Sequence, residues 1–447
     1  MRGIEDLAQA LAAGETTSRA LVEDALSRIA DPAGEGTRVF LRTHADQARA
    51  AADAMDILRK AGRAPSRFAG IPIALKDLFD ITGEPTPAGS VALADAPPAT
   101  TNAPVVQRML NAGFISMGRV NMTEFAFSGL GINPHHGTPT SPWDRASKRI
   151  PGGSSSGTAV AIADGMAAAG LGTDTGGSCR IPAAFCGIVG YKPTARRIPI
   201  TGVLPLAPSL DSVGPLAPTV ACCAAIDAIL AGQDPVAPDA LSLKGARFAV
   251  PSNVVLDGMD ETVAAAFDRA LGALFQAGAQ ITRIACPAFD DLPAINAKGG
   301  FAASEAFAWH RPLLASKGNQ YDPRIRARIA RGEAMSATDY IDLLAARARL
   351  IDSFNASMAG FDAMVMPTVP IIAPTIAELD DERTYNRINL LILRNTALGN
   401  FLDQCAISIP CHHPGEAPVG LMLMGRPMTD QRLFAIARAA EAKLAED

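Results

Sequence analysis

Apolar residues recur at three- and four-residue spacing along most of residues 4–62, which is the pattern of amphipathic helices. The segments IEDLAQALAAG, TTSRALVEDALSRIA and HADQARAAADAMDILRKAG all show it, so residues 1–65 are predicted to form N-terminal helices. A continuous apolar run, FAGIPIALKDLFDI (68–81), then predicts a buried strand. Residues 103–114 predict a further amphipathic helix, which leads into a short strand, ISMGRV.

Residues 151–195 differ from the rest of the chain in charge and in side-chain size. Only four of these 45 residues are charged, and ten of the 40 residues from 151 to 190 are glycine. A segment this small and uncharged is either buried or brings its backbone close to another group. Within it, TAVAIADGMAAAG (158–170) is small and apolar on nearly all sides and predicts a central buried helix.

The second half of the chain alternates helices with short apolar strands. LKGARFAVP, AQITRIAC, AMVMPTVP, CAISIP and VGLMLMG each predict a strand, whereas residues 300–360 are mostly helical and more charged. TDQRLFAIARAAEAKLAE predicts a C-terminal helix. Alternation of helices and strands indicates the α/β class. Because we find neither an internal repeat nor a flexible linker, we expect residues 1–447 to form one large domain.

The composition indicates a globular protein and argues against a nucleic-acid partner. The chain is 48% hydrophobic and 19% charged, which is ample for a large core. Forty basic residues against 45 acidic ones give a net charge of −5, so no basic excess would attract nucleic acid or an anionic membrane. No apolar run has the character of a membrane span. Glu5 and Asp6 lie where a signal peptide would be apolar, so we expect a cytoplasmic protein.

The 7 cysteines and 6 histidines form no metal-binding or redox motif. There is no C-x-x-C pair and no H-E-x-x-H sequence. Cys222 and Cys223 lie in an apolar helical run and are interpreted as buried free thiols, which is typical of a reducing compartment. The sequence therefore implies no metal ion and no organic cofactor.

Lys76 lies in an unusually apolar strand segment, GIPIALKDLF. A lysine in such a place is paired with an acid, extended to the surface, or kept neutral because burial lowers its pKa. Strand lysines usually reach solvent, so this segment alone does not decide between these possibilities. Only a neutral lysine could act as a base.

The serine-rich run PGGSSSG matches a hydrolase motif at first sight. Gly153 to Gly157 fit G-x-S-x-G with Ser155 at the centre, which is the pattern of a nucleophile elbow. That elbow needs a strand directly before the serine, and the preceding SKRIPGG is a poor strand former. We therefore interpret Ser155 as part of a turn and not as a nucleophile.

The glycine-rich segment GLGTDTGGSCRIP (170–182) does not fit a phosphate-binding loop. It lacks the G-K-[ST] of a Walker A loop, and Thr175 stands where a dinucleotide-binding motif has its third glycine. Ser178 follows two glycines, whose backbone allows N–H groups to converge on one point. Such a nest suits acyl transfer, because the oxygen that becomes negative finds donors in place. The alternative is a tight turn between a strand and a helix.

Together these segments resemble the amidase signature family. Its order of motifs is Lys76, then Gly-Gly-Ser154-Ser155 and, 24 residues beyond Ser154, Gly-Gly-Ser178. GIPIALKDLFD and AISIPCHHPGEAPVGLMLMGRPMTDQRLFAIA are similar to the family's lysine segment and to its closing strand and helix. The resemblance is weakest from 287 to 395. It implies a single α/β domain with a mixed central β-sheet covered by helices on both faces.

The resemblance also implies a Ser–cis-Ser–Lys triad. At the matching positions, Ser178 would be the nucleophile, Ser154 the bridging serine beside a cis peptide bond, and Lys76 the base. The oxyanion hole would be formed by the backbone N–H groups of Thr175, Gly176, Gly177 and Ser178. Asp174 and Arg180 flank the nucleophile and are interpreted as an internal ion pair that supports the loop.

The same resemblance implies which residues form the substrate cleft and how the chain is divided into regions. The substrate cleft would include Ala126, Phe127, Ser128 and Gly129. His135 and His136 lie in the loop that follows and are expected to be exposed. Residues 66–220 would form the catalytic core, and residues 287–395 a variable, mostly helical region that determines substrate specificity.

Three functions remain open. The leading one is a hydrolase of amide or carbamate (urethane) C–N bonds in a small molecule, acting as a monomer or homodimer. The alternatives are the A subunit of glutamyl-tRNA amidotransferase, which hydrolyses glutamine within a complex, and a non-catalytic binding protein on the same scaffold. Because Asp174 and Arg180 are expected to pair with each other, we expect a neutral, apolar acyl group beside Phe127. Glutamine and malonamate are then expected to be poor substrates.

Overall fold

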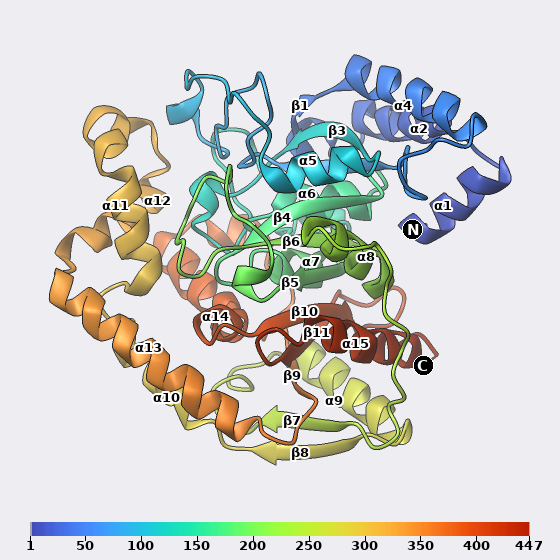
Figure 1. Ribbon diagram of the computed structural model, residues 1–447. Coiled ribbons are helices and arrows are strands. Elements are labelled where there is room, and N and C mark those ends of the chain that lie inside the picture. Colours follow the sequence, from blue (N-terminus) through green and yellow to red (C-terminus); the bar gives the residue numbers. More distant parts are fainter. Residues whose placement is uncertain (1, 447) are drawn as a thin grey trace.

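Eleven strands form one mixed β-sheet that runs through the molecule (Figure 1). The computed structural model describes residues 2–446. The strand order is β1-β3-β2-β4-β6-β5-β10-β11-β9-β7-β8. The strands are β1 (Phe40–Thr43), β2 (Pro72–Lys76), β3 (Ile115–Val120), β4 (Ala169–Asp174), β5 (Val189–Lys192), β6 (Ser212–Ala217), β7 (Arg247–Pro251), β8 (Gln280–Ile284), β9 (Ala363–Pro367), β10 (Cys405–Pro410) and β11 (Gly420–Gly425). Parallel pairs such as β2–β4 and antiparallel pairs such as β4–β6 both occur, so the predicted mixed sheet is confirmed.

Helices cover both faces of this sheet. They are α1 (Ile4–Ala13), α2 (Ser18–Ala30), α3 (Gly36–Val39), α4 (Ala45–Lys60), α5 (Pro104–Asn111), α6 (Ser156–Ala163), α7 (Arg180–Cys186), α8 (Val220–Leu230), α9 (Glu261–Gln276), α10 (Pro287–Ile295), α11 (Gly300–Lys317), α12 (Pro323–Ala330), α13 (Ala337–Ser357), α14 (Glu382–Phe401) and α15 (Asp430–Leu444). One hydrophobic cluster joins the sheet to α5, α8, α9 and α15, and a second joins it to α2, α6 and α7. Short 3₁₀ turns include η2 (Glu124–Ala126), η5 (Gly318–Gln320) and η6 (Arg331–Ala334).

Helices α11, α12 and α13 lie to one side of the sheet, on the left in Figure 1. They belong to the segment expected to be mostly helical, and that expectation is confirmed. Phe301 of α11 and Leu343 of α13 share a hydrophobic cluster with Leu398 of α14 and Met422 of β11. Phe301 and Leu343 therefore pack with α14 against the sheet, and residues of α11 and α12 form part of the wall of the cavity described below.

The glycines of segment 151–195 are needed because the segment is buried and closely packed. All but a few of its residues are buried, as the sequence predicts. A Cβ atom on Gly190 would lie 2.2 Å from the carbonyl oxygen of Cys179, so β5 can approach the chain beneath it only as glycine. Cys222 and Cys223 are buried free thiols, as expected. Within residues 2–446, none of the helices combines the length and apolar character required to cross a membrane.

Three element predictions are wrong at their boundaries. The helix expected over 158–170 ends at Ala163, because Ala169–Asp174 is taken into the sheet between β2 and β6. The strand expected over 68–81 is confined to Pro72–Lys76. The N-terminal segment, expected to be helical, contains β1, which pairs with β3 at the edge of the sheet. In each case hydrogen bonding to a distant strand overrides the local pattern.

Candidate active site

Lys76 is the last residue of β2 and is completely buried. Its Nζ lies 2.7 Å from the Ser154 hydroxyl and 2.8 Å from the Thr173 hydroxyl. Burial lowers the pKa of Lys76 from 10.5 to about 7, although the charges of Cys179, Asp174 and Asp211 raise it. Lys76 is therefore neither paired with an acid nor extended to the surface. It is buried beside two neutral hydroxyl groups. Its ammonium can therefore lose a proton near neutral pH.

Ser154 is held between Lys76 and the segment that carries Ser178. The peptide bond between Gly153 and Ser154 is cis. The Ser154 carbonyl accepts a hydrogen bond from the Thr123 N–H at 3.1 Å. The side chain is fully buried, and its hydroxyl is the only one of the three consecutive serines that contacts Lys76. This serine is therefore placed to exchange a proton with the lysine.

Ser178 lies in the turn that follows β4, next to the start of α6. Its carbonyl accepts a hydrogen bond from the Ser155 N–H at 3.3 Å. The Ser178 hydroxyl makes no hydrogen bond to another described residue, and Ser178 lines the cavity. Ser155, by contrast, is buried at the N-cap of α6, and its hydroxyl contacts the Thr173 carbonyl at 3.4 Å. No strand precedes Ser155, so its interpretation as a turn residue is confirmed.

Asp174 and Arg180 form the predicted internal ion pair. Both side chains are completely buried, and Arg180 Nη2 lies 2.8 Å from Asp174 Oδ1. Although burial alone would raise the pKa of Asp174, Arg180 and a hydrogen bond from Asn400 lower it to about 2. Arg180 also donates to the Asn400 side chain at 2.7 Å and to the Thr396 carbonyl at 2.9 Å. The pair ties the turn after β4 to α14.

The turn between Asp174 and Ser178 borders the cavity. Thr175, Gly176 and Ser178 line it. The Gly177 N–H donates to Asp174 Oδ1 at 2.8 Å, and Gly177 does not line the cavity, so its assignment to the oxyanion hole is not supported. The Thr175 hydroxyl donates to Asp211, which also accepts from the backbone N–H of Ala207. Asp211 therefore fixes one side of this turn.

The cavity has a volume of about 550 Å³. Its walls include the turn at Ser178, the segment 126–128 and residues of α10, α11, α12, η6 and α14. Most of the lining is apolar and includes Leu206, Leu210, Phe289, Phe301, Leu393 and Phe401. A small organic substrate of this size could place one carbonyl group against Ser178 while most of its surface is removed from water.

A family model described as Amidase matches residues 20–434 of this chain. The chain belongs to the amidase family. One relative, the 2-amino-5-chloromuconic acid deaminase of Comamonas testosteroni, is 38% identical over 404 residues, which cover 90% of this chain and 87% of that protein. The A subunit of the glutamyl-tRNA(Gln) amidotransferase of Chloroflexus aggregans is 35% identical over 466 residues, covering 96% and 94% of the two chains.

A solved structure described as the crystal structure of an amidase superposes with a TM-score of 0.89 at 30% sequence identity. The superposition covers 99% of both chains. The single large domain with a central mixed sheet is therefore the amidase fold.

The segment predicted to hold substrate in this amidase lines the cavity in part. Ala126, Phe127 and Ser128 line it, whereas Gly129 does not, and the Gly129 N–H donates to Asn389 Oδ1 at 2.9 Å. The Ser128 hydroxyl donates to the same Asn389 oxygen at 2.9 Å. Ala126 has a positive φ of 59°. Asn389, which lies 261 positions from Ser128 in the sequence, thus fixes this segment to α14.

The expectation that His135 and His136 are exposed is wrong. Both are partly buried, and His135 Nε2 lies 2.9 Å from Glu124 Oε1. Glu124 is completely buried, and it also accepts from the Ser90 hydroxyl at 2.6 Å and from the Asp322 N–H at 2.7 Å. The loop histidine therefore belongs to a buried polar network that reaches the first turn of α12.

Sequence reasoning missed several residues of the amidase site. Thr173 contacts Lys76 only because β4 lies beside β2, and Asn400 reaches Asp174 from 226 positions away. Three arginines also line the cavity, Arg328, Arg331 and Arg394. These arginines are cavity charges beyond Asp174 and Arg180, the pair on which the expectation of a neutral acyl group rests. The higher charge of residues 300–360 was the available signal, but the sequence does not place those residues at the cavity.

Proposed function

We propose that this amidase hydrolyses a C–N bond of an amide or carbamate through an acyl-enzyme on Ser178. Lys76 would act as the base and Ser154 as the proton relay. The proposal is carried by one observation, the 2.7 Å contact between the buried Lys76 Nζ and the Ser154 hydroxyl, beside the turn that carries the cavity-lining Ser178. A lysine whose pKa lies near 7 is neutral often enough to accept a proton.

In the acylation step, a proton passes from Ser178 through Ser154 to Lys76. The Ser178 oxygen attacks the substrate carbonyl while its proton passes to Ser154, whose own proton passes to Lys76. The carbonyl oxygen becomes negative and accepts hydrogen bonds from the backbone N–H groups at Thr175, Gly176 and Ser178. The tetrahedral intermediate then loses its C–N bond. The leaving nitrogen takes a proton from Ser154, which is reprotonated by Lys76, and an ester on Ser178 remains.

Deacylation repeats the relay with water in place of Ser178. Water adds to the ester carbonyl and gives its proton through Ser154 to Lys76. When the intermediate collapses, the Ser178 oxygen leaves and recovers a proton along the same route. The products are a carboxylic acid, or a monoester of carbonic acid from a carbamate, and the free amine or ammonia. No step requires a metal ion or an organic cofactor.

A second candidate is the glutaminase component of a glutamyl-tRNA amidotransferase. The observation that favours it is the 35% identity to such a protein over 96% of this chain. This candidate function predicts glutamine hydrolysis that depends on a partner protein. Another relative is named as a deaminase of 2-amino-5-chloromuconic acid, which is also a C–N cleavage, and it favours an enzyme of small-molecule metabolism.

The test is to locate the acyl group. The purified protein is screened with aliphatic amides, anilides, carbamates and glutamine, and a slowly hydrolysed substrate is used to trap the adduct. We expect intact mass and peptide mapping to place the adduct on Ser178. Ser155→Ala is the matched control, because Ser155 is the neighbouring buried serine without a cavity contact. An adduct on Ser155, or hydrolysis that persists in Ser178→Ala, would overturn the proposal.

A further inference from the structure

Arg328 is a cavity-lining cation without an acidic partner. It belongs to α12, and its guanidinium carbon lies 5.0 Å from the centre of the Phe127 ring. Its Nε is buried and makes no hydrogen bond. Among residues 2–446, no carboxylate lies within ion-pair distance of Arg328, whereas Arg324 on the same helix pairs with Asp322 at 3.1 Å. Arg328 is thus held at the cavity by an aromatic ring and by no anion.

An unpaired guanidinium at this position indicates an anionic ligand. Burial lowers the pKa of Arg328, but a guanidinium remains charged in proteins. Its charge therefore stays poorly compensated until a negative group enters the cavity. A carboxylate fits this position, because two parallel N–H groups of a guanidinium match its two oxygens.

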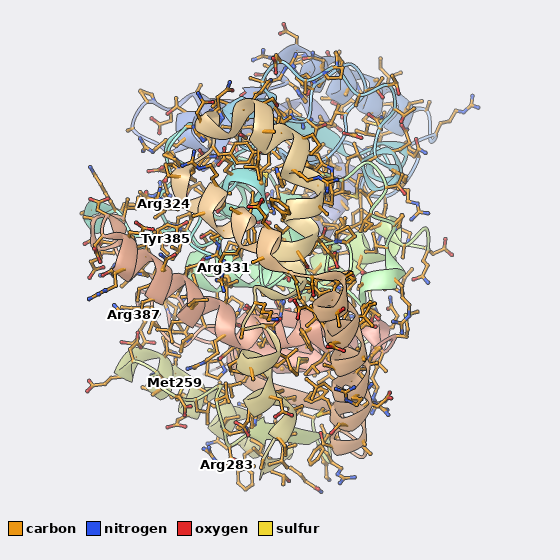
Figure 2. The ribbon with its side chains drawn as sticks, turned by 90° about the vertical axis from the view of Figure 1, so that its left-hand side faces the viewer. Met259, Arg283, Arg324, Arg331, Tyr385 and Arg387 are labelled. Carbon is orange, nitrogen blue, oxygen red and sulfur yellow. The ribbon has the colours of Figure 1, made fainter. Side chains whose placement is uncertain are left out.

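The other charged residues of the cavity have the same sign. Arg331 and Arg394 also line it, and Figure 2 shows Arg331 between the helices of residues 300–334 and α14. Arg331 donates to the Ala297 carbonyl at 3.4 Å, and Arg394 donates to backbone carbonyls at Asp257 and Val255. Neither forms an ion pair with a described residue. Among the described residues that line the cavity there is no aspartate and no glutamate.

We propose that the substrate carries a carboxylate and no ammonium group, and that Arg328 binds the carboxylate. This inference rests on the proposed function and names the substrate class of the same site. An ammonium group would be buried near three arginines without an acidic partner, which is unfavourable. Free glutamine, which carries both groups, would therefore be a poor substrate. A monoamide of a dicarboxylic acid has the charges that the cavity accommodates, and this replaces the expectation of a neutral acyl group.

The experiment compares three amides of the same length. Glutaramate has a carboxylate and no ammonium, glutamine has both, and pentanamide has neither. Malonamate with propanamide, and succinamate with butanamide and asparagine, extend the comparison to shorter chains. At the best chain length we expect kcat/KM for the carboxylate amide to exceed that of both matched amides by about 10- to 100-fold. A neutral amide or an amino-acid amide that is preferred at every length would overturn the inference.

Two substitutions test whether Arg328 causes the preference for carboxylate amides. Arg328→Gln is expected to remove most of the preference for the carboxylate amide over its neutral match. Arg326→Gln is the control, because Arg326 is exposed on the same helix and does not line the cavity, and it should keep the preference. A preference that survives Arg328→Gln contradicts the assignment of this residue.

A binding measurement separates this inference from the proposed function. Calorimetric titration of Ser178→Ala with the same amides compares their affinities without turnover. Tighter binding of the carboxylate amides supports the inference even where the catalytic proposal fails. Equal or weaker binding overturns the inference, even if the wild-type protein hydrolyses neutral amides through Ser178.

Discussion

At the scale of single residues, we expect Lys76 to determine how the rate depends on pH. The proposed mechanism requires a neutral amine, and burial places the pKa of Lys76 at about 7. Below that pH the base is increasingly protonated, so we expect kcat/KM to fall about tenfold for each pH unit. Above it the base is neutral and the rate should remain level. A pH–rate profile from 5 to 10 measures both limbs, and a rate that is level down to pH 5 would contradict the role of Lys76.

Replacement of Lys76 tests the same role without titration. Lys76→Met exchanges a buried amine for an apolar chain of similar length, so the fold should persist while turnover is lost. The Thr173 and Ser154 hydroxyls lose one partner, which is expected to cost about 1–3 kcal/mol of stability. Thermal unfolding and steady-state rates at pH 8 measure the two effects. Near-normal turnover by Lys76→Met would show that another group is the base.

Replacing either serine of the proposed relay should reduce turnover about as much as replacing both. Ser178→Ala removes the proposed nucleophile and Ser154→Ala removes the proposed relay, and each is expected to lower kcat by at least about 10⁴-fold. The double variant should be little slower than either single one, because members of one relay are not additive. Multiplicative losses in the double variant would indicate that the two serines act independently.

At the scale of secondary-structure elements, the Asp174–Arg180 pair connects the turn after β4 to α14. Asp174→Asn leaves a buried guanidinium without its counter-charge, so we expect a loss of about 3–5 kcal/mol in the free energy of unfolding. Asp53→Asn is the control, because the Arg19–Asp53 pair is solvent-exposed and should contribute less than about 1 kcal/mol. Urea unfolding monitored by circular dichroism measures both. Equal losses in the two variants would contradict the structural role of the buried pair.

Glu124 joins the substrate segment to the start of α12. It precedes Ala126 in η2 and accepts a hydrogen bond from the N–H of Asp322, the N-cap residue of the helix that carries Arg328. Glu124→Ala should loosen α12 and raise KM about tenfold for a carboxylate amide, with a smaller change in kcat. Glu333→Ala, an exposed residue of η6, should leave KM unchanged. A loss confined to kcat would place Glu124 in the reaction rather than in positioning.

At the scale of the whole molecule, one chain supplies every residue of the proposed site. Lys76, Ser154, Ser178 and the cavity walls all come from residues 76–401. We therefore expect turnover without a partner protein, at a rate per molecule that is constant over a hundredfold dilution. Activity assays across that range, with size-exclusion chromatography, check this. Activity that appears only with an added partner protein would favour the amidotransferase function.

The main elements and the buried polar contact between Lys76 and Ser154 were predictable from the sequence alone. Short, mostly apolar segments predicted β3 and β10 with their observed limits, because nearly every position of both strands is buried. The near absence of charge in 151–195 correctly indicated burial, since an unpaired charge is costly in a core. The motif order correctly pointed to the buried meeting of Lys76 and Ser154.

Only the tertiary structure decided which distant residues complete the site. Thr173 contacts Lys76 because two strands pair, and Asp322 joins Glu124 from 198 positions away. Arg328 reaches the cavity because α12 packs beside the segment of Phe127, and no local pattern encodes that docking. The spacing of hydrophobic residues shows which face of a helix or strand is buried, but it does not show which other element covers that face. The charge of the cavity, on which the proposed substrate class rests, is therefore a property of the folded chain.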